Sequence, residues 1–307
     1  MKIKKDFIKS PLDSSVKARL TESIFVEGII NGYKNQLSIN VRPYFKEITE
    51  VCIYECERTK YRFYYPFTIG GDNNFYQNLQ QFDWYYNPWK WEQETANSII
   101  KITDKILEVG CGGLGFIEKM NNFGYDITGL ELNKDSIYKA KKLDLKVIEE
   151  SVETHSIKNF EKYDIVCSFQ VLEHISDVHS FLKANIDCIK SGGKLIISVP
   201  NNNSFIKLSK NLYLNMPPHH MGLWNKFSLE SLPSLFNIKL EKIKFEPLAD
   251  YHLDWYVNLN IQERINKNKF SKIIFNRLKL KRSYTYLITK MRRIIHGHTI
   301  LVIYRKV

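Results

Sequence analysis

The chain has 307 residues, of which 44% are hydrophobic and 25% charged. This length allows one large domain, or a domain with a sizeable appendage, and the composition excludes disorder as the main state. The net charge of +12 is confined to one segment, because residues 261 to 307 hold 13 basic residues and a single acid, Glu263. The preceding residues are neutral overall, which argues against a diffusely basic, nucleic-acid-binding protein.

Targeting signals and cysteines bear on the compartment. The first residues lack the apolar stretch of a signal peptide, and no window approaches the ~20 apolar residues that span a bilayer. The five cysteines are scattered, and most lie in apolar surroundings, as reduced buried thiols do. Cys52 and Cys56 have no second pair at zinc-ribbon spacing, so we expect them to pack in a hairpin. We expect a cytoplasmic protein, with a peripheral membrane contact left open.

Residues 1–95 are rich in aromatic side chains and predict a cover over the main domain. Residues 51–54 and 61–65 flank a polar stretch and predict a β-hairpin, whereas the rest of this region looks irregular. Aromatic residues are dense between positions 75 and 91. They favour either a satellite core or the wall of a small-molecule site.

From residue 92 onward the hydrophobic pattern alternates between helices and strands. Strands are expected at 105–109, 127–131, 146–148, 163–169, 194–199, 238–245 and 298–304. Helices are expected at 92–102, up to 120 after the first strand, at 136–142, 177–189 and at 228–236, the last capped by Ser228. Apolar strands between amphipathic helices predict a doubly wound, Rossmann-like α/β sheet of seven strands within residues 96–307.

The loop after the first of these strands, with glycines at 110, 112 and 115, fits two classes of cofactor. Glycines let the backbone approach a ligand, and the amides of a helix N-terminus attract an anion. Glu131, about 20 residues further on, would hold ribose hydroxyls. The anion is a pyrophosphate in an NAD enzyme and a carboxylate in an S-adenosylmethionine (SAM) enzyme. Glu108 favours SAM, because a carboxylate is useful beside its cationic methionine end.

Residues 106–112, Ile-Leu-Glu-Val-Gly-Cys-Gly, resemble motif I of the class I SAM-dependent methyltransferases. Further matches follow in the order of that family at Glu131, 151–153, 169–175, 190–194 and 200–201. The resemblance implies SAM as cofactor and S-adenosylhomocysteine as product, with contacts from Glu108, Gly110, Cys111, Gly112, Gly113, Glu131, Leu132, Val152, Glu153, Phe169, Gln170 and Val171. The family usually has a third glycine where Leu114 stands, so either Gly113 or Gly115 could touch the cofactor.

The aromatic N-terminal region and the Pro-Pro-His-His stretch at 217–220 resemble bacterial methyltransferases that act on sugars in surface-polysaccharide, capsule or glycoside pathways. This resemblance implies methyl transfer to an oxygen of a sugar or glycan-precursor acceptor. We expect Tyr76 and Tyr86 to close over the methionine end of the cofactor.

Methyl transfer requires an acceptor placed in line with the activated methyl group and, for a hydroxyl, a general base. His219 and His220, in a proline-stiffened loop after the fifth strand, are the first candidates for that base. His174, after the fourth strand, is the next. Metal-dependent transfer needs clustered carboxylates after the fourth and fifth strands. No Asp follows the fourth strand, and Asn201 and Asn202 follow the fifth, so we expect a metal-independent SN2 reaction.

The basic segment lies in an insertion, residues 250–297, between the last two expected strands. Its apolar residues recur at three- and four-residue steps and predict two amphipathic helices with basic outer faces. Three interpretations remain: a solvated surface, attraction of an anionic acceptor such as a nucleotide sugar, or contact with a membrane that carries lipid-linked glycans.

Other functions remain open at this stage. Within methyltransferases they are methylation of a sugar carbon or nitrogen, of a phosphorylated modification, or of a quinone-type phenol. Outside them are an NAD-dependent dehydrogenase, since the glycine loop fits both cofactors, and a SAM-binding protein without catalysis.

Overall fold

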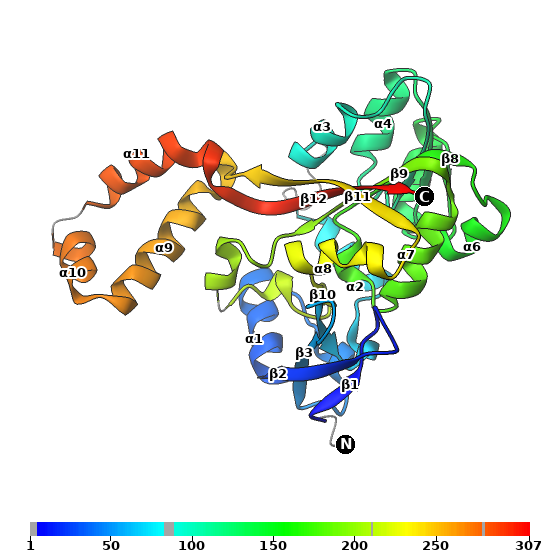
Figure 1. The fold of residues 1–307 in the computed structure, drawn as a ribbon. Coiled ribbons are helices and arrows are strands. Elements are labelled where there is room, and N and C mark those ends of the chain that lie inside the picture. The colour runs from blue at the N-terminus through cyan, green and yellow to red at the C-terminus, as the bar shows by residue number, and fades with distance from the viewer. Residues whose placement is uncertain (1–4, 83–88, 210, 278–279) are drawn as a thin grey trace.

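The computed structural model describes residues 5–82, 89–209, 211–277 and 280–307, which form two β-sheets with helices packed around them (Figure 1). The larger sheet has the strand order β11-β12-β9-β8-β5-β6-β7. Strands β5 to β9 pair in parallel, whereas β11 and β12 pair antiparallel at one edge. The strands are β5 (Lys105–Val109), β6 (Asp126–Leu130), β7 (Val147–Ile148), β8 (Tyr163–Phe169), β9 (Ile189–Pro200), β11 (Ile238–Pro247) and β12 (His296–Lys306).

This sheet is buried on both faces, as its continuous apolar strands predict. Ile106 and Leu107 are both fully buried but belong to opposite core clusters, and Ile196 and Ile197 divide in the same way. The helices on one face are α3 (Trp91–Asn97), α4 (Gly115–Asn122) and α5 (Lys134–Lys142), and those on the other are α6 (Val152–Lys158), α7 (Val178–Asp187) and α8 (Lys226–Glu230). The predicted doubly wound α/β fold with a seven-stranded sheet is confirmed.

The helix predicted at 228–236 begins earlier and is capped by a different residue. Helix α8 starts at Lys226, and the side chain of Asn225 accepts a hydrogen bond from the Ser228 backbone N–H at 3.1 Å. The Ser228 hydroxyl in turn accepts the Asn225 N–H at 3.0 Å. The prediction of Ser228 as the cap is wrong, because this serine is the third helical residue in a reciprocal capping box.

The N-terminal region forms a second, antiparallel sheet rather than the irregular cover expected outside the hairpin. Strands β1 (Phe7–Lys9), β2 (Lys17–Phe25), β3 (Glu50–Cys56) and β4 (Arg62–Tyr65) are completed by β10 (Gly222–Leu223), which comes from much later in the chain. Helices α1 (Val26–Leu37) and α2 (Asn73–Gln80) pack on it. The hairpin of β3 and β4 is present as predicted.

The basic insertion forms an arm that projects away from both sheets, orange to red in Figure 1. Its helices are α9 (Leu253–Lys267), α10 (Lys269–Lys272) and α11 (Lys281–Met291). Helical segments occur at both predicted places, as α10 with the turn at Ile273–Arg277 and as α11, but α9, the longest helix of the arm, was not expected. At the root of the arm, Val257 and Ile288 pack against Phe205 and Leu248. None of the helices in the described ranges has the length and apolar character to cross a membrane.

Candidate functional site

The loop after β5 holds three residues in the left-handed backbone region: Gly110 (φ +74°), Gly112 (φ +41°) and Leu114 (φ +67°). A Cβ atom on Gly110 would lie 2.6 Å from Cγ2 of Val171, so only glycine fits there. Leu114 stands where the resembled family has its third glycine, and it keeps the backbone conformation that glycine adopts most readily. Burial of the Leu114 side chain in the core offsets the cost of this conformation.

Glu131 holds the glycine loop against the end of β6. One carboxylate oxygen accepts the Gly112 N–H at 2.7 Å, and the other accepts the N–H groups of Leu132 and Asn133 at 2.8 Å. Three bonds leave a carboxylate with capacity for about one more donor. Contact between Glu131 and ribose hydroxyls therefore stays a prediction, and the bonds in the structure show that this residue positions the loop.

Glu108 is an acid buried at the end of β5. Its side chain is 4% exposed, and Oε2 has no hydrogen-bond partner. Burial, reinforced by the negative charge of Glu131, raises the pKa of Glu108 to about 8. A buried acid of this kind is stabilised by a cation that arrives with a ligand, so Glu108 fits the ammonium end of the cofactor that the sequence predicts.

We expect Glu108→Gln to raise the melting temperature of the ligand-free protein at pH 9 by about 3 °C or more, and to change it little at pH 5. Because the pKa of Glu108 is raised in the folded state, the stability that its neutral form contributes is present below pH 4.5 and is lost as the pH rises through about 8. Scanning calorimetry at both pH values measures the difference. An equal shift at both values would contradict this assignment.

The residues predicted to hold the adenine end lie along the neighbouring strand ends. Leu132 is exposed after β6, whereas Val152 is buried and Glu153 is half-buried in the first turn of α6. Phe169 ends β8 and packs edge-on against Phe116, with ring centroids 5.0 Å apart. An exposed leucine beside buried apolar side chains is a suitable surface for a planar ring.

The other predicted cofactor contacts surround the glycine loop. Gln170 is left-handed (φ +55°), and its N–H bonds to the Ser198 carbonyl at 2.9 Å, which turns the chain after β8. Cys111 is buried against Gly129 of β6. Gly113 lines a small surface hollow beside Leu114. Since β5 pairs with both β6 and β8, the structure brings these strand ends together at one edge of the sheet.

The three predicted catalytic histidines form one cluster. His174 ends a short 3₁₀ helix after β8, and its ring centroid lies 4.6 Å from that of His219 and 4.9 Å from that of His220. The Nδ1 atoms of His174 and His219 donate to the carbonyls of His219 and Leu214 at 2.7 and 2.8 Å. Nδ1 of His220 donates to Oδ1 of Asn215 at 2.9 Å. Each ring is therefore the Nδ1–H tautomer, with its lone pair on Nε2.

These histidines are neutral at physiological pH. Burial lowers the pKa of His174 to about 4, and burial together with the neighbouring rings lowers the pKa of His219 and His220 well below the usual value. A cluster of neutral imidazoles with lone pairs on Nε2 can accept a proton or coordinate a cation.

Three tyrosines of the N-terminal region hold the histidine loop in place. The hydroxyls of Tyr33, Tyr64 and Tyr76 donate to the carbonyls of Met216, Asn215 and His219 at 2.9, 3.0 and 3.5 Å. The Tyr76 ring also lies 5.6 Å from that of His174. Tyr76 thus borders the histidine cluster, and closure over the cofactor stays a prediction. Tyr86 lies outside the described residues.

We expect Tyr64→Phe to lower methyl-transfer turnover at least about 10-fold, since it leaves the Asn215 carbonyl without its donor and frees the loop to shift. Tyr54→Phe is the matched control, because Tyr54 is also buried and its hydroxyl bonds to backbone far from the loop, at Lys5. Both variants should lose about 1–2 kcal/mol of stability by denaturant unfolding. Equal turnover in the two would contradict the positioning role.

Sequence reasoning missed a second polar cluster at the same edge of the sheet. Its members are five ionisable side chains that lie near the charge of Lys90: Glu92, Glu173, Glu246, His252 and His298. Burial raises the pKa of Glu92 to about 7 and that of Glu173 to about 8. Glu92 Oε2, Glu173 Oε2 and His252 Nδ1 are buried without a partner. The only sequence signal was Glu173, which lies inside the matched motif at 169–175.

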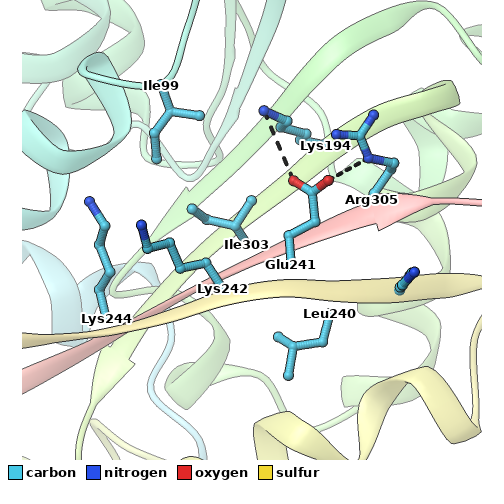
Figure 2. Close-up of a pocket in the computed structure, with 9 residues that line it drawn as sticks. Ile99, Lys194, Leu240, Glu241, Lys242, Lys244, Ile303 and Arg305 are labelled. Carbon is cyan, nitrogen blue, oxygen red and sulfur yellow. Dashed lines mark hydrogen bonds and ion pairs between the residues drawn. The ribbon is translucent and has the colours of Figure 1, made fainter.

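A hollow of about 610 Å³ lies over β11, β12 and Lys194 of β9. Figure 2 shows that basic side chains line it, and that Glu241 pairs with Lys194 and Arg305. Two of the basic groups that line the hollow are therefore already paired with a carboxylate of the protein. The hollow contains none of the predicted site residues.

Comparison with known proteins agrees with this arrangement. Residues 90–241 match the family model described as a methyltransferase domain. The ubiquinone biosynthesis O-methyltransferase of Proteus mirabilis is 31% identical over 145 residues, which cover 44% of this chain and 58% of that protein. The protein of the same name from Salmonella newport is 33% identical over 105 residues, covering 32% and 43%. The chain therefore spans about half the length of these curated relatives.

A solved SAM-dependent methyltransferase from Archaeoglobus fulgidus matches the fold with a TM-score of 0.51 and 20% identity. The match covers 75% of this chain and all of that one. Together with the strand order, this likeness establishes the fold. Residues 90–241 therefore resemble a methyltransferase domain, and the strand order is that of the class I methyltransferase fold.

Proposed function

We propose that this protein transfers a methyl group from SAM to a hydroxyl oxygen of a polar, sugar-like acceptor. The observation that carries the proposal is a group of buried polar atoms without partners at the carboxyl edge of the sheet: Oε2 of Glu92, Glu108 and Glu173, and Nδ1 of His252. Buried polar atoms are costly unless they are hydrogen-bonded. They favour a cationic cofactor at Glu108 and a ligand rich in hydroxyl groups at the other three.

The residues around the glycine loop fit SAM. Bound SAM supplies a methyl group that its sulfonium has already activated. Within this proposal Glu108 faces the ammonium group, the amides near Gly112 face the carboxylate, and Leu132 and Val152 contact the adenine. The remaining requirements are to hold the acceptor in line and to exclude water, which are effects of orientation.

The proton of the acceptor leaves, in this proposal, at the histidine cluster. His219 and His220 are the predicted bases, and their Nδ1–H tautomers leave the Nε2 lone pairs to accept it. Their lowered pKa values keep both rings in the neutral, accepting form across the physiological range.

A phenolic acceptor is the second candidate. The name shared by the curated relatives favours transfer to an oxygen of a quinone-type phenol. The polar cluster favours the sugar, because an apolar ring would leave the buried atoms of Glu92, Glu173 and His252 unpaired. A sugar or glycan precursor satisfies them with its hydroxyl groups.

Calorimetric titration should show SAM binding with a micromolar Kd and no NAD binding; micromolar NAD binding without SAM binding would overturn the proposal.

Radiolabelled methyl transfer should then be measured on nucleotide sugars and on a hydroxylated quinone. We expect Glu173→Gln to lower transfer to the sugar at least about 10-fold and to leave SAM affinity unchanged. Glu57→Gln, an exposed carboxylate in the β3–β4 turn, is the control. Turnover of the quinone alone would select the phenolic acceptor.

We also propose that the enzyme works in the cytoplasm and that its arm contacts an anionic membrane surface. All five cysteines are unpaired and buried, as in a reducing compartment. On α11, Ile288 is buried against α9, whereas Tyr286 and Leu287 are exposed. Exposed apolar side chains interleaved with the basic Arg282 and Lys290 are typical of helices that lie in a membrane interface.

Replacing Arg282, Lys290 and Arg293 together with glutamine should weaken binding to vesicles that contain anionic lipid by about 100-fold, at roughly 1 kcal/mol per basic residue. Sedimentation with anionic and with neutral vesicles measures the effect. The control changes three exposed lysines of the N-terminal region, Lys9, Lys34 and Lys46. Unchanged sedimentation would refute the membrane contact, and a higher KM for an anionic acceptor would instead assign the arm to substrate attraction.

A further inference from the structure

We infer that His174, His219 and His220 form a binding site for a divalent transition-metal ion, with zinc as the preferred ion. One ring nitrogen of each histidine lies within 4.8 Å of a ring nitrogen of each of the other two. Among the residues that the structure describes, no other group of three or more histidine, cysteine or acidic side chains converges in this way. The site goes beyond methyl transfer, and its existence does not depend on which acceptor is used.

The hydrogen bonds around the cluster are those that metal-binding histidines need. A ligating imidazole usually donates its other ring N–H to a carbonyl or carboxylate, which fixes the tautomer and the direction of the ring. Here each Nδ1 donates to an oxygen, two of them to backbone carbonyls and the third to Asn215. Asn215 is itself oriented, because its Nδ2 donates to Oδ1 of Asn202 at 2.7 Å. All three Nε2 atoms thus carry lone pairs that suit an ion.

Packing holds the three rings as one unit. His219 and His220 stack with their planes 22° apart, and both are 7% exposed. The Phe75 and Tyr76 rings pack against His219, at centroid distances of 5.9 and 6.1 Å. This packing fixes the positions of the three rings relative to one another, and neutral imidazole is the form that binds metals.

The donor set selects the ion. Three nitrogens and no carboxylate exclude magnesium and calcium as preferred ions. The sequence-based expectation of no metal considered only carboxylate ligands after β8 and β9, and histidine ligands were not part of it. Zinc with three histidines keeps a fourth position open for water or a substrate oxygen. Zinc–nitrogen distances of about 2.0–2.1 Å in a tetrahedral site place the nitrogens about 3.4 Å apart, so nitrogens that lie within 4.8 Å of one another need to approach by at most about 1.4 Å.

With an ion bound, the three histidines are ligands rather than bases. The ion would then supply Lewis-acid chemistry at its open position, where it would lower the pKa of a bound hydroxyl. Such a site lies beside the polar cluster, because His174 directly follows Glu173 in the chain.

The test uses the full chain, freed of metal by dialysis against a chelator, in the absence of SAM and acceptor. Zinc affinity is measured by competition with a chromogenic chelator, and cobalt(II) provides visible absorption bands. We expect one ion per chain in a nitrogen-ligated, four-coordinate spectrum without thiolate charge transfer. His174→Gln and His220→Gln should each weaken zinc binding at least about 100-fold, and Asn215→Ala about 10-fold.

His179→Gln is the matched control, because His179 also donates from Nδ1 to a carbonyl, that of Leu12, but lies outside the cluster. Its zinc affinity should equal that of the wild type. Absence of zinc binding by the wild type, or equal affinities in all variants, overturns the site. If the histidine variants fail to fold, the zinc affinity and cobalt spectrum of Asn215→Ala test the site instead. Loss of methyl transfer in a protein that still binds one zinc would count against the proposed function alone.

Discussion

The hydrogen bonds that N-terminal tyrosines donate to the histidine loop are the contacts on which the candidate site depends. The loop has little regular structure of its own, and its direction is set from outside by the hydroxyls of Tyr33 and Tyr64. The backbone is anchored as well, since the Gly71 N–H bonds to the Pro218 carbonyl at 2.7 Å and the Met221 N–H to the Glu173 carbonyl at 2.8 Å. The N-terminal sheet therefore acts as a scaffold for the chemistry at the main sheet.

The second feature of the site is an imbalance in its electrostatics. Acids at Glu92, Glu108 and Glu173 are buried with raised pKa values, and the neighbouring histidines are buried with lowered ones. Both shifts have the same cause, since removal from water disfavours whichever form is charged. A ligand that brings charge or hydrogen-bonding groups lowers the free-energy cost of burying these side chains. The ligand-free protein is therefore less stable at this edge of the sheet, and ligand binding is favoured there.

The sequence predicted the parts of the fold that depend on local pattern. The strand at 105–109 and its partners are short apolar runs between amphipathic helices, and such runs determine a parallel sheet. Strand β2 was not predicted from the sequence, because most of its side chains are exposed and its hydrophobic residues do not alternate. Helix α9 was not predicted for a similar reason, since Val257 and Ile261 are its only buried residues. Both elements form because they pair or pack with distant parts of the chain, and the local propensity of their residues contributes little to their formation.

The site could be predicted only where its residues share a motif. The glycine loop and Glu108 are contiguous, and His219 and His220 are adjacent. The second polar cluster combines Glu92, Glu173 and His252, which are far apart in the sequence and meet only when the sheet is assembled. The tautomers of the histidines follow from the positions of the Leu214 and Asn215 oxygens, which no spacing rule specifies.

The short strand β10 has a consequence for how the chain folds. Gly222 pairs with Phe63 and Leu223 with Arg62, so the last strand of the N-terminal sheet is made of residues synthesised some 160 positions later. On the ribosome the edge of β4 stays open until most of the main sheet has emerged. Contacts of such long sequence separation slow folding and leave an exposed strand edge in the meantime. The histidine loop directly precedes β10, so the candidate catalytic cluster cannot form before this part of the chain has been synthesised.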